Sequence, residues 1–226
     1  MGSIFGKQVM LTVICLVHNA PLHVYQFMET FLDHPPPCEH ELLVLDNGSE
    51  EAARGVLAMY EGKENVKLMR SDENLMFSGG NNLAFQHRSP NSEMTLLVNS
   101  DVEFLDDRWL LPLANSGCSI SGYGVLENPT RPDGWCMMVE TSLYDKYKMD
   151  EDFPFWFGSR KLVSDVLRGG GTACAIQGHA SLLLHVGGAS GGNSSPLCAP
   201  KNMADVAGWF KDLPPVLVLD AMSLLL

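Results

Sequence analysis

The feature that most constrains the fold is an unbroken apolar run at residues 8–17, which ends at the polar pair His18 and Asn19. The run is rich in β-branched side chains and shows no alternation between apolar and polar residues. This is typical of a strand buried on both faces of a sheet. Residues 41–45 are predicted as a second buried strand, residues 66–70 as a short third strand and residues 94–98 as a fourth strand.

Helices are expected between these strands. Residues 22–32 carry apolar side chains at helical spacing, and the prolines at 35–37 end this helix. A second helix is predicted at 50–60, and a short one at 83–87 after a glycine- and asparagine-rich loop at 74–82. Strands that alternate with helices over short links predict an α/β fold, a single Rossmann-like, doubly wound and mostly parallel sheet flanked by helices.

The second half of the chain is less regular. The predicted elements are a strand at 134–139, a helix at 160–168 and a last strand at 180–186. Glycine, serine and proline then become frequent, so residues 191–226 are expected to form a linker and a short helix, near 204–210, that packs on the domain. The domain itself is assigned to residues 1–190.

Charge and composition exclude some classes of partner. Hydrophobic residues make up 46% of the chain and charged residues 19%, as in ordinary globular enzymes, and the net charge is -12. An acidic chain is unsuited to a nucleic-acid backbone or an anionic membrane, which attract clustered lysine and arginine. It can still bind a nucleoside diphosphate when a divalent cation lies between the like charges.

The six cysteines show neither C-x-x-C pairs nor zinc spacing. We therefore expect reduced thiols and a cytoplasmic location. No apolar stretch reaches the ~20 residues of a membrane span, and none resembles a signal peptide.

Polar residues follow three of the predicted strands, at His18-Asn19, Asp46-Asn47 and Asn99-Ser100-Asp101. Because ligands of open α/β sheets bind beyond the carboxyl ends of the strands, these clusters predict one shared ligand site. The alternative is that each residue only forms a turn or caps the next helix. Three clusters in register favour the ligand site.

Four motifs in order resemble the nucleotide-binding half of inverting GT-A glycosyltransferases, over residues 9–104. They are the strand before His18-Asn19, the run Leu45-Asp46-Asn47-Gly48-Ser49, the loop from Asn74 to Asn82, and Leu97-Val98-Asn99-Ser100-Asp101. The resemblance is to family 2, and within it to the rhamnosyltransferase-like branch. It continues more weakly through the acceptor and catalytic half, residues 105–190.

The resemblance implies a role for each matched position. The expected nucleotide-sugar ligands are His18, Asn19, Asp46, Asn74, Gly80, Asn81, Asn99 and Ser100. An acceptor-only carboxylate at Asp46 suits the imide N–H of uracil or a ribose hydroxyl. Glycines at the 79–80 turn permit close backbone approach to the nucleotide.

The resemblance also implies a metal site. Asn99-Ser100-Asp101 matches the family's D-x-D motif with Asn99 in place of its first aspartate, so Asp101 is the expected carboxylate ligand of Mn²⁺ or Mg²⁺. His185, before a glycine turn, matches a second protein ligand, although a histidine at a strand end is often only a backbone partner. Trp135 falls where relatives line the sugar and acceptor site, or it packs in the core.

The catalytic base departs from the family. Relatives carry D-E-x-F-x-x-Y-x-E-D, whose last aspartate is the base, and here Gly158 and Ser159 stand at the last two positions. A serine has no useful pKa for this task. Asp152 and Glu151 are the candidate bases, with Asp150 and Asp165 as nearby alternatives. Arg160 or Lys161 could instead bind the diphosphate.

These features predict a metal-dependent enzyme that moves a sugar, with inversion, from a nucleoside diphosphate sugar to an acceptor hydroxyl. A UDP-hexose is the expected donor, and the acceptor is open. The alternatives are a degenerate nucleotide-sugar binding module without a base, and a nucleotidyltransferase. The last would need a glycine-rich basic loop after the first strand, and His18-Asn19-Ala20-Pro21 is not one.

Overall fold

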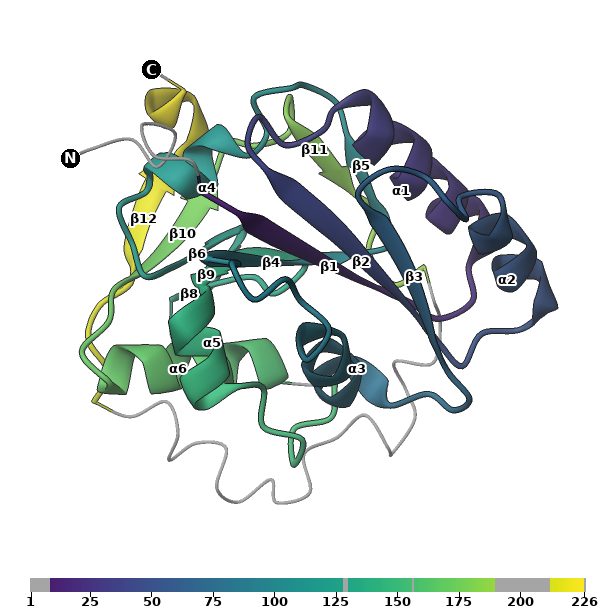
Figure 1. Ribbon diagram of the computed structural model, residues 1–226. Helices are drawn as coiled ribbons and strands as arrows, with labels where there is room; N and C mark the ends of the chain where they lie inside the picture. The colour runs from purple at the N-terminus through teal and green to yellow at the C-terminus, as the bar shows by residue number, and fades with distance from the viewer. Residues whose placement is uncertain (1–8, 128–129, 156, 190–211, 226) are drawn as a thin grey trace.

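The computed structural model describes residues 9–127, 130–155, 157–189 and 212–225. Its main sheet contains β1 (Leu11–Val17), β2 (His40–Asn47), β3 (Val66–Ser71), β4 (Met94–Asn99), β6 (Ile120–Tyr123), β9 (Cys136–Glu140), β10 (Ala173–Gln177) and β12 (Leu217–Asp220). These eight strands lie in the order β12-β10-β6-β9-β4-β1-β2-β3 (Figure 1). Strand β9 runs antiparallel to its neighbours β4 and β6, and every other pairing is parallel.

Helices cover both faces of this sheet. They are α1 (Pro21–Asp33), α2 (Glu51–Ala58), α3 (Met76–Phe85), α4 (Leu111–Asn115), α5 (Thr141–Tyr147) and α6 (Gly158–Arg168). Helices α1 and α2 lie on one face, and α3, α5 and α6 on the other (Figure 1). Within the described residues, no helix is both long and apolar enough to cross a bilayer.

Two small sheets complete the fold. Strand β5 (Val102–Phe104) pairs antiparallel with β11 (Leu183–His185), and β7 (Val125–Leu126) pairs antiparallel with β8 (Arg131–Pro132). The sheet of β5 and β11 positions the candidate site, because it joins the segment after β4 to a segment some eighty residues later in the chain.

Strand β1 explains why its sequence shows no alternation. Val13, Cys15 and Val17 belong to the core under α1, whereas Ile14 belongs to the core under α3 and α6, and all four are fully buried. Both faces of the strand are covered, so apolar side chains stabilise the fold at every position. The predicted α/β class, with a mostly parallel sheet flanked by helices, is confirmed.

Most predicted elements of the first half are found within a few residues of their expected ends. The prediction of a loop at 74–82 is wrong, because α3 begins at Met76 and contains this segment. Two of its polar side chains bond locally or to a neighbouring loop: Asn81 Nδ2 donates to Phe77 O at 2.8 Å, and Asn82 Nδ2 donates to Met149 O at 2.8 Å. Tertiary contacts of this kind override the low helix propensity of glycine and asparagine.

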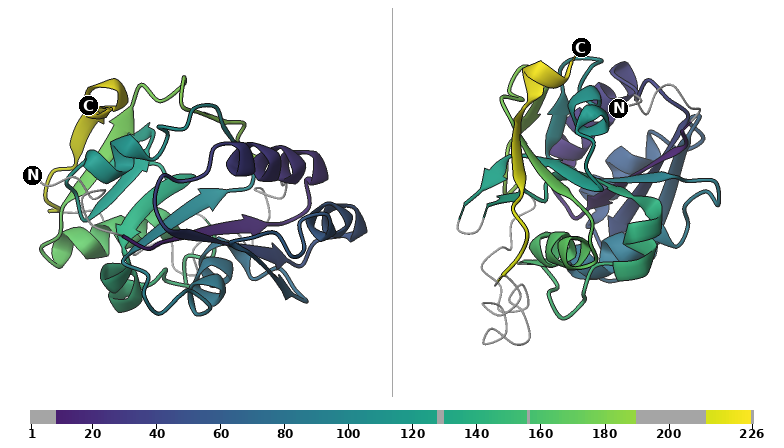
Figure 2. Two further views of the ribbon diagram at one scale, coloured as in Figure 1. Left: turned by 45° about the horizontal axis from the view of Figure 1, so that its top comes forward. Right: turned by 90° about the vertical axis from the view of Figure 1, so that its left-hand side faces the viewer.

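The second half contains strands that the sequence did not predict, namely β6, β10 and β12 of the main sheet and the short strands β7 and β8. The strand expected at 180–186 is reduced to β11, and it is not the last strand, because β12 follows it at the sheet edge. Figure 2 shows β12 and the 3-10 helix η3 (Ala221–Leu224) at the opposite end of the molecule from α2. The linker and helix expected within 191–210 lie outside the described residues.

The expectation of reduced thiols is wrong for one pair of cysteines. Cys118, just before β6, forms a disulfide with Cys174 of β10, and the Cα atoms are 5.9 Å apart. Cys15, Cys38 and Cys136 are free thiols, of which Cys15 and Cys136 are buried. Spacing in the sequence could not reveal the pair, because β6 and β10 become neighbours only through the sheet order.

Candidate functional site

The polar clusters predicted from the sequence do share one edge of the sheet. Strand β1 is parallel to both β2 and β4, with Val17 opposite Asp46 and Leu16 opposite Asn99. The segments that follow these strands therefore start from the same edge. This register brings His18, Asp46 and Asn99 to one side of the molecule, as expected for the ligand edge of an open α/β sheet.

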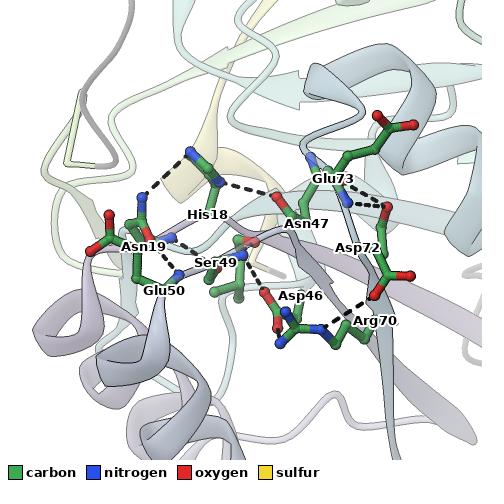
Figure 3. A network of polar contacts seen from close by, with 11 residues as sticks. His18, Asn19, Asp46, Asn47, Ser49, Glu50, Arg70, Asp72 and Glu73 are labelled. Carbon is green, nitrogen blue, oxygen red and sulfur yellow. Dashed lines mark hydrogen bonds and ion pairs between the residues drawn. The ribbon is translucent and has the colours of Figure 1, made fainter.

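The loop after β1 is fixed by bonds to the loop after β2 (Figure 3). His18 Nδ1 donates to Asn47 O at 3.0 Å, and Asn19 N donates to Ser49 Oγ at 2.9 Å. The side chain of Asn19 accepts from Glu50 N at 2.9 Å, at the start of α2. Asn19 thus braces the two loops, and its positive φ of 59° is a conformation that asparagine tolerates better than most residues.

Asp46 is buried, with 4% of its surface exposed, and both of its oxygens have protein partners. Ser49 N donates to Oδ1 at 2.8 Å, and Arg70 Nη1 donates to Oδ2 at 2.9 Å (Figure 3). The Arg70 side chain is 42% exposed, so it extends this charged pair towards solvent. Sequence reasoning missed Arg70, although it stands at the end of the predicted third strand, where the same edge rule applies.

Asn47 and Asn74 form hydrogen bonds with each other and with the backbone at the start of α3. Asn47 Nδ2 donates to Asn74 Oδ1 at 3.0 Å, and Leu75 N donates to Asn47 Oδ1 at 2.9 Å. Asn74 Oδ1 also accepts from Met76 N at 2.8 Å. These bonds hold the α3 entry against the end of β2.

Gly80 and Asn81 lie inside the fold rather than at its surface. A Cβ atom at Gly80 would come within 2.9 Å of Leu16 Cδ1, so the glycine permits α3 to pack against β1. Asn81 is 1% exposed and bonds within its own helix. The close approach that glycine permits here is between helix and sheet.

Asp101 and His185 come together through the small sheet of β5 and β11. His185 lies opposite Val102 in the antiparallel register, and its Nε2 is 3.3 Å from Asp101 Oδ1. Val186 N donates to Asp101 O at 3.1 Å, which fixes the crossing of the two segments. Asn99 Nδ2 is 3.4 Å from His185 Nε2, so the start of the N-S-D motif faces the same imidazole.

The environment of Asp101 favours its charged form. Burial by itself raises the pKa of this carboxyl group, but the hydrogen bond and the charge of His185, together with the N–H group of Ala189, lower the pKa below its usual range. Ala189 N lies 3.3 Å from Asp101 Oδ2. An anionic oxygen beside an imidazole is a suitable donor pair for a divalent cation.

The spacing of this pair fits one shared ion. Two ligand atoms in adjacent positions of an octahedral ion, each about 2.1 Å from it, lie about 3 Å apart. The separation of Asp101 Oδ1 and His185 Nε2 is 3.3 Å. Within the described ranges no cluster contains three or more histidine, cysteine or acidic side chains that could hold a metal. A metal at this pair would need further ligands from its substrate or from water.

Trp135 is both a core residue and a neighbour of the Asp101–His185 pair. Its side chain is 5% exposed, and its ring stacks on His185 with centroids 4.7 Å apart and an interplanar angle of 12°. Ser100, the middle residue of the motif, is buried at the turn between β4 and β5.

The two candidate bases lie on the loop between α5 and α6. Glu151 Oε1 accepts from Asn82 Nδ2 at 3.0 Å, and both Glu151 and Asp152 are exposed. Asp150 accepts from Asp152 N at 3.0 Å and lies 3.5 Å from Lys161 Nζ.

The start of α6 is closely packed where relatives carry the acidic pair. A Cβ atom at Gly158 would lie 2.5 Å from Ser78 Oγ and 3.0 Å from Phe153 O, so a side chain there would force its neighbours to shift. Ser159 packs directly against Gly134, the residue before Trp135. Lys161 is buried, and its Nζ donates to Asp165 Oδ2 of the same helix at 2.6 Å and lies 3.5 Å from Asp150 Oδ2.

Comparison with known proteins agrees with this architecture. Residues 12–117 match the family described as Glycosyl transferase family 2. No curated protein sequence matches the chain.

Solved structures share the fold at low sequence identity. The mannosyltransferase PcManGT from Pyrobaculum calidifontis, solved with GDP-Man and Mn²⁺, aligns with a TM-score of 0.62 and 13% identity over 72% of this chain and 53% of its own. S. aureus TarS 1-349 aligns with a TM-score of 0.56 and 15% identity over 70% of this chain and 55% of its own. The chain therefore spans about half the length of these structures. Residues 12–117 carry the signature of glycosyl transferase family 2, and the chain has the GT-A fold of these glycosyltransferases.

Proposed function

We propose that this chain is a metal-dependent glycosyltransferase that moves a sugar from a nucleoside diphosphate sugar to an acceptor hydroxyl, with inversion at the sugar carbon. The observation that carries the proposal is the pairing of Asp101 with His185 at 3.3 Å. The two residues are far apart in sequence, and they meet beside the edge that also carries His18 and Asp46. A nucleotide site and a metal site side by side suit a nucleoside diphosphate donor.

The nucleoside half of the donor is assigned to the edge formed by β1, β2 and β3. Asp46 retains acceptor capacity on both oxygens beyond its bonds to Ser49 and Arg70, and a carboxylate suits the imide N–H of uracil. Arg70 beside it can donate to a base carbonyl. This donor and acceptor pair supports a uridine nucleotide, and UDP-hexose remains our proposed donor. His18, Asn19, Asn74 and Ser100 are proposed to shape or line the same site, with Gly80 and Asn81 supporting it from within α3.

The diphosphate is assigned to Asp101, His185 and Asn99. A bound Mn²⁺ or Mg²⁺ would supply positive charge to the diphosphate oxygens as the sugar leaves. Asp101 and His185 would hold the ion. Asn99, within 3.4 Å of His185 Nε2, can donate its amide hydrogens to a ribose or phosphate oxygen.

The chemical step requires a base for the acceptor hydroxyl. The hydroxyl oxygen forms a bond to the anomeric carbon while the bond from that carbon to the diphosphate breaks, and the hydroxyl proton passes to a carboxylate. Glu151 and Asp152 are the proposed bases because they are exposed on the loop that leads into α6. Asp150 is less suited, since Lys161 and the Asp152 N–H group already occupy it.

The direct test is a panel of nucleotide sugars, scored for Mn²⁺-dependent thermal stabilisation and for hydrolysis or transfer. A ligand that stabilises the folded state raises the melting temperature according to its concentration relative to Kd. We expect a UDP-sugar to stabilise the chain only when Mn²⁺ or Mg²⁺ is present, and Asp101→Asn to abolish that difference. Equal stabilisation with Mn²⁺ and with EDTA would refute metal dependence.

A second function is favoured by one observation, the absence of a carboxylate in the first turn of α6. Ser159 stands where relatives carry the base, and Gly158 stands at the acidic residue before it, where a Cβ atom would lie 2.5 Å from Ser78 Oγ. The alternative is a nucleotide-sugar binding module without transfer activity. It predicts metal-dependent binding of the donor with no turnover for any acceptor and no hydrolysis above the uncatalysed rate. A cytoplasmic location stays a prediction beside both functions, and the disulfide argues against it.

A further inference from the structure

Trp135 stacks on His185, the histidine of the Asp101–His185 pair. Its indole ring lies nearly parallel to the His185 imidazole, with 4.7 Å between centroids and 12° between planes. The two residues come from different sheets, since Trp135 precedes β9 of the main sheet and His185 ends β11 of the small sheet. An indole has no free lone pair for a metal, so any role of Trp135 at this site must act through His185.

The plane of His185 decides whether it can bind a metal. The lone pair of Nε2 lies in the ring plane, so a rotation about the Cβ–Cγ bond moves it away from an ion beside Asp101. A histidine ligand is usually oriented by a hydrogen bond to its other ring nitrogen. Among the described residues, no hydrogen bond reaches His185 Nδ1. Stacking on Trp135 is therefore the contact that fixes the ring plane, while Asp101 and Asn99 lie at its Nε2 edge.

Trp135 is itself held firmly. Asn99 N donates to Trp135 O at 2.8 Å, which ties the tryptophan to the end of β4. Its ring also stacks near Tyr123, with centroids 5.9 Å apart and an interplanar angle of 20°, and the Tyr123 hydroxyl donates to Trp109 O. A rigid aromatic surface can restrict its neighbour to one orientation at little further entropic cost.

We propose that Trp135 is a positioning residue that holds the His185 imidazole in the orientation needed to bind a divalent cation together with a nucleoside diphosphate. This inference rests on the proposed function, because it takes His185 as a metal ligand. It assigns to Trp135 a part in metal affinity, in addition to its place in the core.

The test compares two substitutions at this position. Trp135→Leu keeps an apolar side chain but removes the flat ring, and Trp135→Phe keeps a ring that can stack. The matched control is Phe85→Leu, which replaces another buried aromatic ring in the core on the α3 face of the sheet. Calorimetry with UDP present measures Mn²⁺ affinity, and thermal melting confirms folding.

Trp135→Leu is expected to weaken Mn²⁺ binding about tenfold, the lower end of the effect of losing the support of a metal ligand. Trp135→Phe should restore most of the affinity, and Phe85→Leu should lower the melting temperature without changing Mn²⁺ affinity. In a His185→Ala background, Trp135→Leu should have no further effect, because the two residues act through one ligand. Unchanged affinity in Trp135→Leu, or an undiminished effect in the His185→Ala background, would overturn the proposal.

A second measurement separates this inference from the proposed function. In the metal-free protein, an indole stacked on the imidazole shifts the His185 ring-proton resonances upfield, and Trp135→Leu should abolish that shift. If the shift is present but the wild type binds no Mn²⁺ with UDP, the metal function fails and the role of Trp135 in metal binding fails with it. If the wild type binds Mn²⁺ but the shift is absent, the function stands and only the orientation by Trp135 is refuted.

Discussion

Asp46 offers the sharpest test of the nucleotide site, through the substitution Asp46→Ala. The carboxylate joins the end of β2 to the loop that follows it and to β3, because it accepts from Ser49 N at 2.8 Å and from Arg70 Nη1 at 2.9 Å. Removing it should affect both the ligand and the fold, and the structure allows the two effects to be estimated separately.

The binding effect should be the larger one. Loss of one hydrogen bond to a charged group costs about 1.5–3 kcal/mol, which corresponds to about a ten- to hundredfold weaker Kd for UDP. The folding effect should be about 1 kcal/mol for the lost turn bond to Ser49, with little more from Arg70, whose side chain is 42% exposed. In a chain of this size that corresponds to a fall in melting temperature of about 2–4 °C.

Calorimetry with UDP and Mn²⁺, paired with thermal melting, measures both quantities. The matched control is Asp72→Ala, because Asp72 also lies near Arg70, with 4.0 Å between Oδ1 and Nε, but is fully exposed. We expect the Asp72 variant to bind UDP like the wild type. Equal affinities of the wild type and Asp46→Ala would refute the assignment of Asp46 to the nucleotide, as would an equal loss in both variants.

Other predictions concern the metal, the base and the disulfide. Asp101→Asn should remove the Mn²⁺ dependence of UDP binding, measured by calorimetry with and without EDTA, and a retained dependence would exclude Asp101 as a ligand. Folding lowers the pKa of Asp101, so its charged carboxylate stabilises the fold above the ordinary aspartate pKa of about 3.9. This stabilisation is lost as the pH falls through the lower pKa of the folded state. Melting curves of the metal-free Asp101→Asn variant should lack that acid dependence. Glu151→Gln or Asp152→Asn should lower kcat while leaving donor affinity unchanged. The control Asp145→Asn, at an exposed site on α5, should leave both kcat and donor affinity unchanged. A normal kcat in both loop variants would exclude these bases. Cys118→Ser should lower the free energy of unfolding by about 2–4 kcal/mol without altering UDP affinity, and an equal stability of the two proteins would indicate that the disulfide does not form.

The first half of the fold could be predicted because each strand is a continuous apolar run that ends in polar residues. This signal is local, so it located β1, β2, β3 and β4 and identified the shared edge that carries His18 and Asp46. The same edge rule, applied to the predicted third strand, would also have identified Arg70.

Other features depend on contacts that no local pattern reveals. The segment 74–82 looked like a loop because glycine and asparagine disfavour helices, yet Gly80 is needed for packing against Leu16. The pairing of His185 with Asp101 depends on β11 lying beside β5, and only the family resemblance suggested it. Cys118 and Cys174 meet through the order of strands in the sheet, which the sequence did not disclose.

The missing carboxylate at the start of α6 is built into the packing of this chain. A glutamate at position 158 would force its surroundings to shift, because its Cβ atom would lie 2.5 Å from Ser78 Oγ and 3.0 Å from Phe153 O. Ser78 is itself fully buried and donates its hydroxyl to Phe153 O at 2.5 Å. The departure therefore involves α3, the loop before α6 and α6 together. Because position 159 carries a serine, the base is sought elsewhere, and the exposed loop carboxylates Glu151 and Asp152 are the first groups to test.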